Sequence, residues 1–181
     1  MIWVIALALG LIAGLLAGGR IDNFTRLRFR WPWLVLAAVV VRLAVLLPPL
    51  NHVQGAQWIY AVSLGVIVLW SFLHAVRIPG IWLVGIGGLL NLAVIVANGA
   101  RMPVEAALAG DLLRRGPIGQ YVLMGAGTQL NPLADWISIP STSEVYSPGD
   151  LVIAAGLALV AFLVARRKPA PGPIRPRRAV S

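Results

Sequence analysis

The residues of this chain that could do chemistry are few, and Arg42 is the most conspicuous because an apolar stretch surrounds it. A charge at the centre of a bilayer costs at least about 2.5 kcal/mol before compensation, so it needs a functional or structural reason. Arg42 lies nine residues after Trp33, and Asn91 lies nine residues after Trp82. If both stretches form helices that run in the same direction, these two polar side chains lie at the same depth. Asn98 follows Asn91 by seven residues, which is two turns along the same helix face.

These residues predict a polar pocket formed by Arg42, Asn91 and Asn98, open to the outer side of a membrane and covered by a loop that carries Arg101 and Asp135. The planar guanidinium group binds phosphate or carboxylate in a bidentate manner. We therefore predict a protein that binds, or moves, an anionic lipid or a small solute. The alternative is an accessory or assembly subunit of a larger membrane complex, with no ligand of its own. An enzyme that acts on a lipid headgroup ranks third.

Two other roles for Arg42 stay open. It can extend its guanidinium to the outer headgroups, since its apolar stretch ends a few residues later. It can also pair with Asp135 as a purely structural contact. Among the acidic residues, Asp135 is the strongest candidate for a functional role, because most of the others suit the first turn of a helix. Asp135 can equally pair with an arginine at the base of the loop, such as Arg101.

The sequence lacks the usual ingredients of catalysis and metal binding. It contains no cysteine, which excludes disulfides, thiolate metal sites and cysteine nucleophiles. The two histidines, His52 and His74, are predicted on opposite sides of the membrane and cannot share a metal ion. No Asp or Glu lies within an apolar stretch, which argues against coupling to protons or sodium through a buried carboxylate. We predict no catalytic residue, no metal and no cofactor.

Five apolar stretches supply the elements that would position these residues. Each is long enough, or nearly long enough, to form a membrane-spanning helix, which needs about 20 apolar residues. The chain is 59% hydrophobic and 12% charged, against about a quarter charged in a soluble domain. We predict an all-α integral membrane protein, a five-transmembrane-helix bundle, with spans at residues 2–18, 33–47, 57–73, 79–97 and 151–165.

Positive charge predicts the orientation of this bundle. Eleven Lys and Arg residues fall on one side, in the segments after the first, third and fifth stretches, whereas three fall on the other side, namely Arg101, Arg114 and Arg115. By the positive-inside rule, the N-terminus lies outside and the C-terminus is cytoplasmic. All seven tryptophans fall near a predicted membrane interface, where indole rings are favoured. The net charge of +9 forms no basic stripe along a soluble face, so no nucleic-acid partner is predicted.

Residues 1–165 are predicted to form one membrane domain, and residues 166–181 a disordered, basic and proline-rich cytoplasmic tail attracted to anionic lipid. In the first stretch, Gly10, Gly14 and Gly18 continue a four-residue repeat of small residues that allows close helix packing. This repeat favours packing on a neighbouring helix of the same chain over a dimer. The predicted partners are membrane lipids, and a membrane-protein partner or a homo-oligomer stays open.

The loop of residues 98–150 carries signals of local structure. Asn98 and Gly99 suit the end of a helix. Residues 103–115 predict an amphipathic helix on the membrane surface or across the bundle, and residues 121–124 predict a short interfacial or re-entrant segment. Two further helix starts are indicated, one by a capping box of Ser141 and Glu144 and the other by Ser147, Pro148 and Asp150.

The segment from Asn91 to Pro103 resembles the signature of a family of small bacterial membrane proteins of unknown function. The stretch from Leu133 to Asp150 is similar to the second signature of that family, through Asp135, Ile139-Pro140 and Ser147-Pro148-Gly149-Asp150. The glycine-rich first stretch that leads into Gly19-Arg20 is similar as well. Where the family has a second glycine after Asn98-Gly99, this chain has Ala100. The resemblance implies a bacterial multi-pass protein of the plasma membrane, and it implies no reaction.

Overall fold

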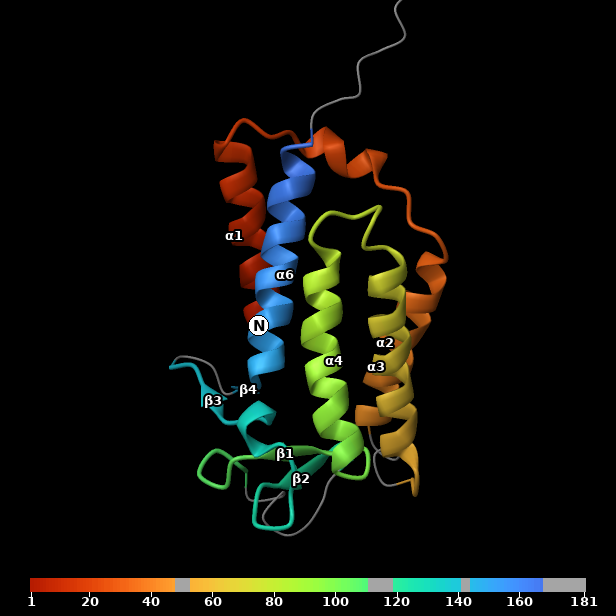
Figure 1. Cartoon of the computed structure of the whole chain (residues 1–181), viewed down its shortest axis with the longest axis vertical. Coiled ribbons are helices and arrows are strands. Elements are labelled where there is room, and N and C mark those ends of the chain that lie inside the picture. The colour runs from red at the N-terminus through yellow and green to blue at the C-terminus, as the bar shows by residue number, and fades with distance from the viewer. Residues whose placement is uncertain (48–52, 111–118, 141–143, 168–181) are drawn as a thin grey trace, which may run out of the picture.

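In the computed structural model, residues 1–47, 53–110, 119–140 and 144–167 are described, and α-helices account for most of them. The helices are α1 (Ile2–Leu16), α2 (Pro32–Leu46), α3 (Ala56–Leu73), α4 (Ile81–Ala97) and α6 (Pro148–Ala165), labelled as in Figure 1. They lie within a few residues of the five predicted apolar stretches. The chain is therefore mostly helical, as predicted. Most of the predicted tail, residues 168–181, lies outside the described residues.

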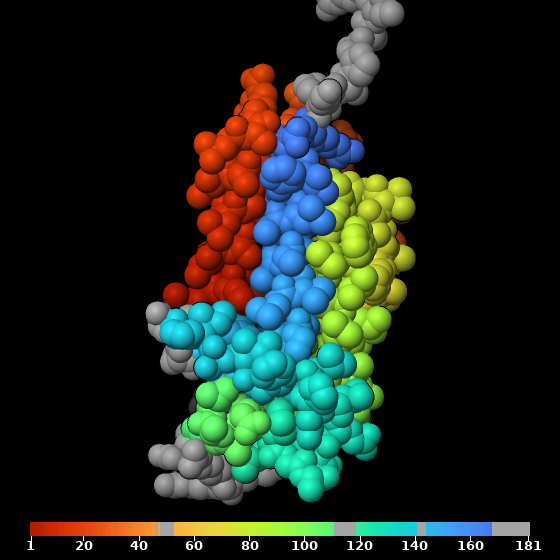
Figure 2. Space-filling model, turned by 60° about the vertical axis from the view of Figure 1, so that its left-hand side comes forward, coloured from red at the N-terminus to blue at the C-terminus, as the bar shows by residue number. Residues whose placement is uncertain are grey.

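The helices pack side by side in the spatial order α1, α6, α4, α3, α2, and Figure 2 shows α6 between α1 and α4. The first and last helices run parallel, because Gly10 faces Ala158 and Gly14 faces Phe162. Along the chain, successive helices alternate in direction (Figure 1). Residues 98–110, 119–140 and 144–147 therefore lie at the same end of the bundle as Met1, which we call the loop end. Residues 17–31 and 74–80 lie at the opposite end, which we call the linker end.

Two of the described helices, α3 and α6, are long and apolar enough to cross a membrane, with 18 residues each. The other three are apolar but shorter, with 15 residues in α1 and α2 and 17 residues in α4. An 18-residue helix is about 27 Å long at 1.5 Å per residue, close to the thickness of the hydrocarbon core. Length and composition thus identify two candidate spans among the described residues.

Glycines bring α1 and α6 into backbone contact. A Cβ atom on Gly10 would overlap the carbonyl oxygen of Ala158, and one on Gly14 would lie 2.8 Å from the Cβ atom of Ala165. Both glycines are buried. Gly18 differs from this pattern, because it lies beyond the end of α1 and has a φ of +83°. A Cβ atom at this position would have no contact within 4 Å. Its left-handed backbone ends the helix, and Gly19 makes the next close contact, with Ala165.

The linker end is closed by backbone and side-chain hydrogen bonds to the last turn of α6. A 3-10 helix, η1 (Ile21–Arg26), lies against α6. The Asn23 side-chain amide donates to the carbonyl oxygens of Ala165 at 2.7 Å and Arg167 at 2.9 Å, and the Arg20 N–H donates to Ala165 at 2.8 Å. The last carbonyls of a helix have no partner within it. Asn23 and Arg20 therefore supply hydrogen-bond partners to carbonyl groups at and just after the end of α6.

The loop end contains short strands rather than the predicted helix. β1 (Met102–Val104) pairs in parallel with β2 (Tyr121–Leu123), and β3 (Ile137–Ser138) pairs antiparallel with β4 (Val145–Tyr146). A 3-10 helix, η3 (Asn131–Leu133), lies between β2 and β3. Residues of this region cover the loop end of the bundle (Figure 1). Ala100, Met102 and Ala134 join the buried core formed by α2, α3 and α4.

Two predictions for this loop are wrong where the structure describes it. The predicted helix of residues 103–115 does not form at its start, where the chain belongs to β1 instead. β1 bonds to β2 on one side and to Asp135 on the other, and this pairing outweighs the helical spacing of the apolar residues. The rest of that prediction, from residue 111, lies outside the described residues. Residues 121–124 form β2 and its end, and their predicted interfacial or re-entrant location stays a prediction. Glu144 precedes a strand and caps no helix, whereas Ser141 lies outside the described residues.

Candidate functional site

Arg42 in α2 lies against Tyr60 in α3, near the loop end. Its guanidinium carbon is 3.8 Å from the centre of the Tyr60 ring, and its Nη2 donates a hydrogen bond to the Tyr60 hydroxyl. A cation stacked on an aromatic face is stabilised by the ring quadrupole. The other terminal nitrogen, Nη1, is buried and has no hydrogen-bond partner. Arg42 is thus held in one orientation with one donor unused.

Asn91 does not lie free in a pocket, because it joins α4 to the first turn of α6. Its amide nitrogen donates to Asp150 Oδ1 at 2.8 Å, and its oxygen accepts from the Ser147 hydroxyl at 2.8 Å. Ser147 and Asp150 also form the capping box of α6, as the sequence predicts, with bonds of 3.0 and 3.1 Å. Both polar groups of Asn91 are therefore bonded within the protein.

Asn98 is also bonded, and it fixes a neighbouring turn. Its amide nitrogen donates to the carbonyl oxygens of Val94 at 2.8 Å and Gln129 at 2.9 Å, and its oxygen accepts from the Gln129 N–H at 2.8 Å. Asn98 is the last residue associated with α4, and Gly99 follows at φ +66°, as the sequence predicts for the end of this helix. Asn98 therefore attaches the loop to α4.

Asp135 and Arg101, like Arg42, each have a buried polar side-chain atom without a hydrogen-bond partner. The backbone of Asp135 is fixed beside β1, since its N–H donates to Pro103 at 3.0 Å and its carbonyl accepts from Glu105 at 2.8 Å. Its side chain is only 7% exposed. Asp135 Oδ1 and Arg101 Nε are both buried without a hydrogen-bond partner. Buried polar atoms without partners are rare, so each calls for a physical explanation.

No ion pair joins Asp135 to an arginine within the described part of the chain, where the ion pairs are Met1–Glu144 and Arg20–Asp22. The structure therefore favours neither the Arg42–Asp135 pairing nor the Arg101–Asp135 pairing that the sequence allows. Asp135 lies close enough to Asp150 to interact with it electrostatically. Burial, and to a smaller extent the charge of Asp150, raises the pKa of Asp135 to about 8. Asp135 is therefore protonated at neutral pH.

This raised pKa predicts how stability depends on pH. The pKa of Asp135 is about 8 in the folded state against 3.8 for the free side chain, so the folded state binds this proton more tightly. The contribution of this proton to the free energy of unfolding is fully present below pH 4 and is lost as pH rises from 4 to 8. We expect Asp135→Asn to remove this slope and to raise the free energy of unfolding at pH 9 by more than about 2 kcal/mol. Unfolding in detergent at a series of pH values measures it.

The matched control for this experiment is Asp22→Asn, because the side chain of Asp22 is 73% exposed and lies at the linker end. That variant should show the same dependence of stability on pH as the wild-type protein. A wild-type stability that stays level between pH 4 and 8 would contradict a buried, unpaired Asp135.

The structure thus brings together a different set of residues from the predicted one. Tyr60 is buried and lies against Arg42, and Asp135 pairs with the backbone of β1, whose Met102 packs in the same core as Tyr60. Arg101 lies between Ala100 and Met102, which pack in the same core as Tyr60. Tyr60 is not among the predicted site residues, and nothing in its spacing marks it out, since a tyrosine near the start of an apolar helix is ordinary. We call Arg42, Tyr60, Arg101 and Asp135 the loop-end cluster.

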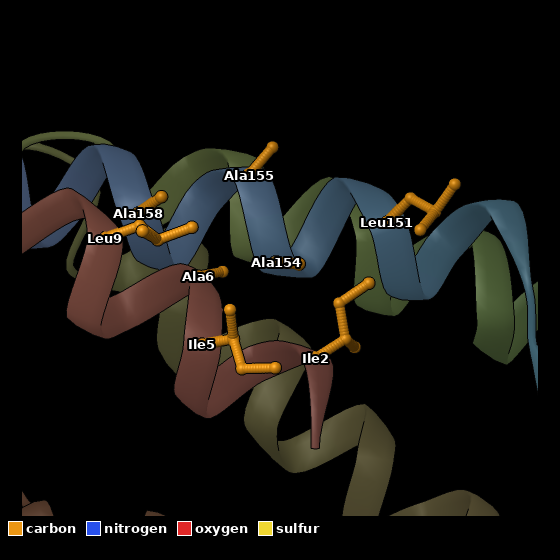
Figure 3. Close-up of a pocket in the computed structure, with 8 residues that line it drawn as sticks. All are labelled: Ile2, Ile5, Ala6, Leu9, Leu151, Ala154, Ala155 and Ala158. Atoms are coloured by element: carbon orange, nitrogen blue, oxygen red, sulfur yellow. The ribbon is translucent and has the colours of Figure 1, made fainter. Parts of the chain in front are cut away.

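A second feature is an apolar groove of about 310 Å³ between α1 and α6, drawn in Figure 3. The groove opens along the side of the bundle and is lined by Ile2, Ile5, Ala6, Leu9, Leu151, Ala154, Ala155 and Ala158. All of its lining side chains are aliphatic, so it has no group that could do chemistry. In the described part of the chain, no group of three His, Cys, Asp or Glu side chains could hold a metal ion.

Comparison with known proteins gives a family and no relative of known activity. No curated protein and no solved structure matches the chain. A family model described as a family of unknown function (DUF5317) matches residues 26–162. This range contains Arg42, Asn91, Asn98, the whole loop and most of α6, but not α1. The resemblance noted from the sequence to a family of unknown function is confirmed, and the chain belongs to the DUF5317 family of unknown function.

Proposed function

We propose that the chain is a multi-pass protein of a bacterial plasma membrane whose five helices all cross the bilayer, with the loop end outside. Three observations support this. The helices alternate in direction, their outward side chains include many exposed aliphatic residues such as Val4, Leu36 and Val62, and exposed tryptophans occur near both ends. Contiguous exposed apolar surface is unusual in a soluble monomer. The excess of positive charge at the linker end supports a cytoplasmic location for that end.

We further propose that the loop-end cluster binds an anionic group, either a phosphate or a carboxylate. The observation that carries this proposal is the set of three buried polar side-chain atoms without hydrogen-bond partners, Arg42 Nη1, Arg101 Nε and Asp135 Oδ1. Leaving a buried donor or acceptor unpaired costs about 1–3 kcal/mol, and more when it is charged. A ligand that supplies oxygen atoms to both arginines would remove much of that cost.

The electrostatics of the cluster suit an anion. Arg42 and Arg101 are cations, and Asp135 is neutral below about pH 8, so it does not repel a negative group at neutral pH. A protonated carboxyl can also donate one hydrogen bond. Tyr60 holds Arg42 in place before a ligand arrives, which reduces the entropy lost on binding. Asn91 and Asn98, which are bonded to other protein groups, position the helices and the loop instead of contacting the ligand.

Binding to the purified protein tests this proposal and separates two sources of the anion. The delipidated protein in a neutral detergent would be titrated with inorganic phosphate and with acetate, and then with phosphatidylglycerol and phosphatidylcholine. Binding of the free anions identifies a small solute as the source, whereas binding of phosphatidylglycerol alone identifies a lipid headgroup. We expect Arg101→Gln to weaken binding about tenfold, which corresponds to about 1.4 kcal/mol.

Arg20→Gln is the control, because Arg20 is exposed and lies at the linker end. It should leave the affinity unchanged. Arg42→Lys keeps the charge but loses the planar fork, and it should weaken binding as well. If none of the four probes binds, or if Arg101→Gln and Arg42→Lys both bind like wild type, the loop-end cluster is not an anion site.

A second candidate function is an accessory subunit of a larger membrane complex. The observation that favours it is that Asn91 and Asn98, two of the five predicted ligand residues, are fully engaged in structural contacts. A membrane-protein partner that stays bound through purification in mild detergent, combined with no binding of the anionic probes, would favour this function over ligand binding.

A further inference from the structure

The linker between α1 and α2 is held rigidly at Arg30 by two buried residues at the end of α3. The Arg30 N–H donates to His74 Nε2 at 3.1 Å, and Trp70 Nε1 donates to the Arg30 carbonyl oxygen at 2.9 Å. His74 Nδ1 lies 2.8 Å from the Trp70 carbonyl oxygen. The histidine thus accepts at Nε2 and donates at Nδ1, which assigns it as the neutral tautomer with the proton on Nδ1.

Aromatic stacking strengthens this attachment. The Trp70 and His74 rings stack with their centres 3.9 Å apart. The Phe29 ring also stacks on Trp70, with 6.0 Å between the ring centres. His74 is 1% exposed and Trp70 is 9% exposed. Both hydrogen-bonding groups of the Arg30 backbone and both ring nitrogens of His74 are therefore used to fix a short linker between helices.

The linker fixed in this way presents arginines to the surroundings. Arg28 and Arg30 are exposed, and the guanidinium of Arg30 lies 5.1 Å from the centre of the exposed Trp31 ring. Arg77 is also exposed, and its N–H donates to the His74 carbonyl oxygen at 2.9 Å. The same buried histidine thus connects the two segments that carry these arginines. We call Arg28, Arg30, Trp31 and Arg77 the linker-end surface.

The surroundings of this surface are also basic. Arg20, Arg26, Arg166 and Arg167 are exposed at the same end. Among the described residues of the two linkers there is one acidic side chain, Asp22, and it lies 3.6 Å from Arg20. The partner of such a surface must be anionic. Exposed Trp33 and Trp82 flank it at the starts of α2 and α4, and indole rings favour the headgroup level of a bilayer.

We propose that the linker-end surface is a binding site for the headgroup of an anionic phospholipid, in the leaflet that surrounds this end of the bundle. Guanidinium groups bind a phosphate in a bidentate manner, and Trp31 packs against the glycerol and upper acyl region. The proposal rests on the membrane location proposed above but not on the loop-end cluster. It differs from general attraction of basic residues to lipid, because His74 and Trp70 hold the backbone of Arg30 in place and His74 also bonds to the backbone of Arg77.

The test uses the full-length protein in neutral detergent, titrated with fluorescent phosphatidylglycerol and phosphatidylcholine. We expect wild type to bind phosphatidylglycerol at least tenfold more tightly than phosphatidylcholine. The triple variant Arg28→Gln, Arg30→Gln, Arg77→Gln should lose most of this preference. Its matched control is Arg166→Gln with Arg167→Gln, which removes charge at the same end and should change the affinity less than twofold.

A charge-neutral variant separates a fixed site from diffuse attraction. Trp70→Phe removes the N–H that bonds to Arg30 but keeps an aromatic ring, and we expect it to weaken phosphatidylglycerol binding about threefold with no change of net charge. If binding falls in proportion to the number of charges removed and Trp70→Phe binds like wild type, the surface is not a built site. In Arg101→Gln, the part of the phosphatidylglycerol binding that depends on Arg28, Arg30 and Arg77 should remain, so the loop-end proposal can fail independently.

Discussion

Replacing Gly10 by leucine is expected to cause the largest loss of stability of any single change considered for this protein. A Cβ atom at this position would overlap the backbone carbonyl of Ala158, which no side-chain rotation can relieve. The leucine therefore forces α1 away from α6 along their whole contact. We expect the free energy of unfolding to fall by about 3 kcal/mol or more. Unfolding followed by circular dichroism in mild detergent measures this change.

Gly65→Ala provides the control for this result. Gly65 lies in α3, and the nearest atom to its Cβ direction is 3.8 Å away, an ordinary contact with Leu92. Alanine favours a helix over glycine by up to about 1 kcal/mol, so this variant should be as stable as wild type or slightly more stable. If Gly10→Leu unfolds at the same midpoint as wild type, α1 and α6 do not pack through this glycine.

The second large effect is expected for Asn91→Leu. Leucine has a similar size but bonds neither to the Ser147 hydroxyl nor to Asp150 Oδ1. Both groups lie at the start of α6, and Ser147 is fully buried. We expect a loss of about 2–3 kcal/mol of folding stability, because buried polar partners are left unpaired. The same unfolding assay measures it.

Two further measurements identify the reason for that loss. In a double-mutant cycle, Asn91→Leu and Ser147→Ala should be clearly non-additive, since both remove the same hydrogen bond. The folded fraction of Asn91→Leu should also bind the anionic probes as wild type does, because Asn91 is engaged in structural contacts. Additive losses in the cycle, or loss of anion binding without loss of stability, would instead make Asn91 a ligand residue.

Several features of the fold follow from the sequence because their causes are local. Runs of apolar residues form α1, α2, α3, α4 and α6 near the predicted positions. The start of α6 follows from Ser147, Pro148 and Asp150, whose side chains and fixed φ act within one turn. The end of α4 at Asn98 and Gly99 is local for the same reason, since a glycine reaches positive φ at little cost.

The contacts that define the candidate sites were decided by the tertiary structure. Tyr60 as the partner of Arg42 and Ser147 as the partner of Asn91 depend on how each helix is rotated and on which helix is its neighbour. Spacing along a single helix carries neither piece of information. The predicted equal depth of Arg42 and Asn91 therefore did not place them in one pocket, because Asn91 faces α6 and Arg42 faces α3.

Residues 102–104 give the clearest case of tertiary structure outweighing a local pattern. Their segment reads as the start of an amphipathic helix, but backbone hydrogen bonds from both sides, to β2 and to Asp135, make it a strand. In the same way, four-residue spacing includes Gly18 in the packing face of α1, although the helix ends at Leu16. The sequence by itself determined the positions of the five apolar helices to within a few residues, the end of α4 and the start of α6, because apolar runs and capping groups act over one or two turns. Only the tertiary structure decided which polar groups find partners and which stay unpaired, because that depends on the packing of segments far apart in the chain.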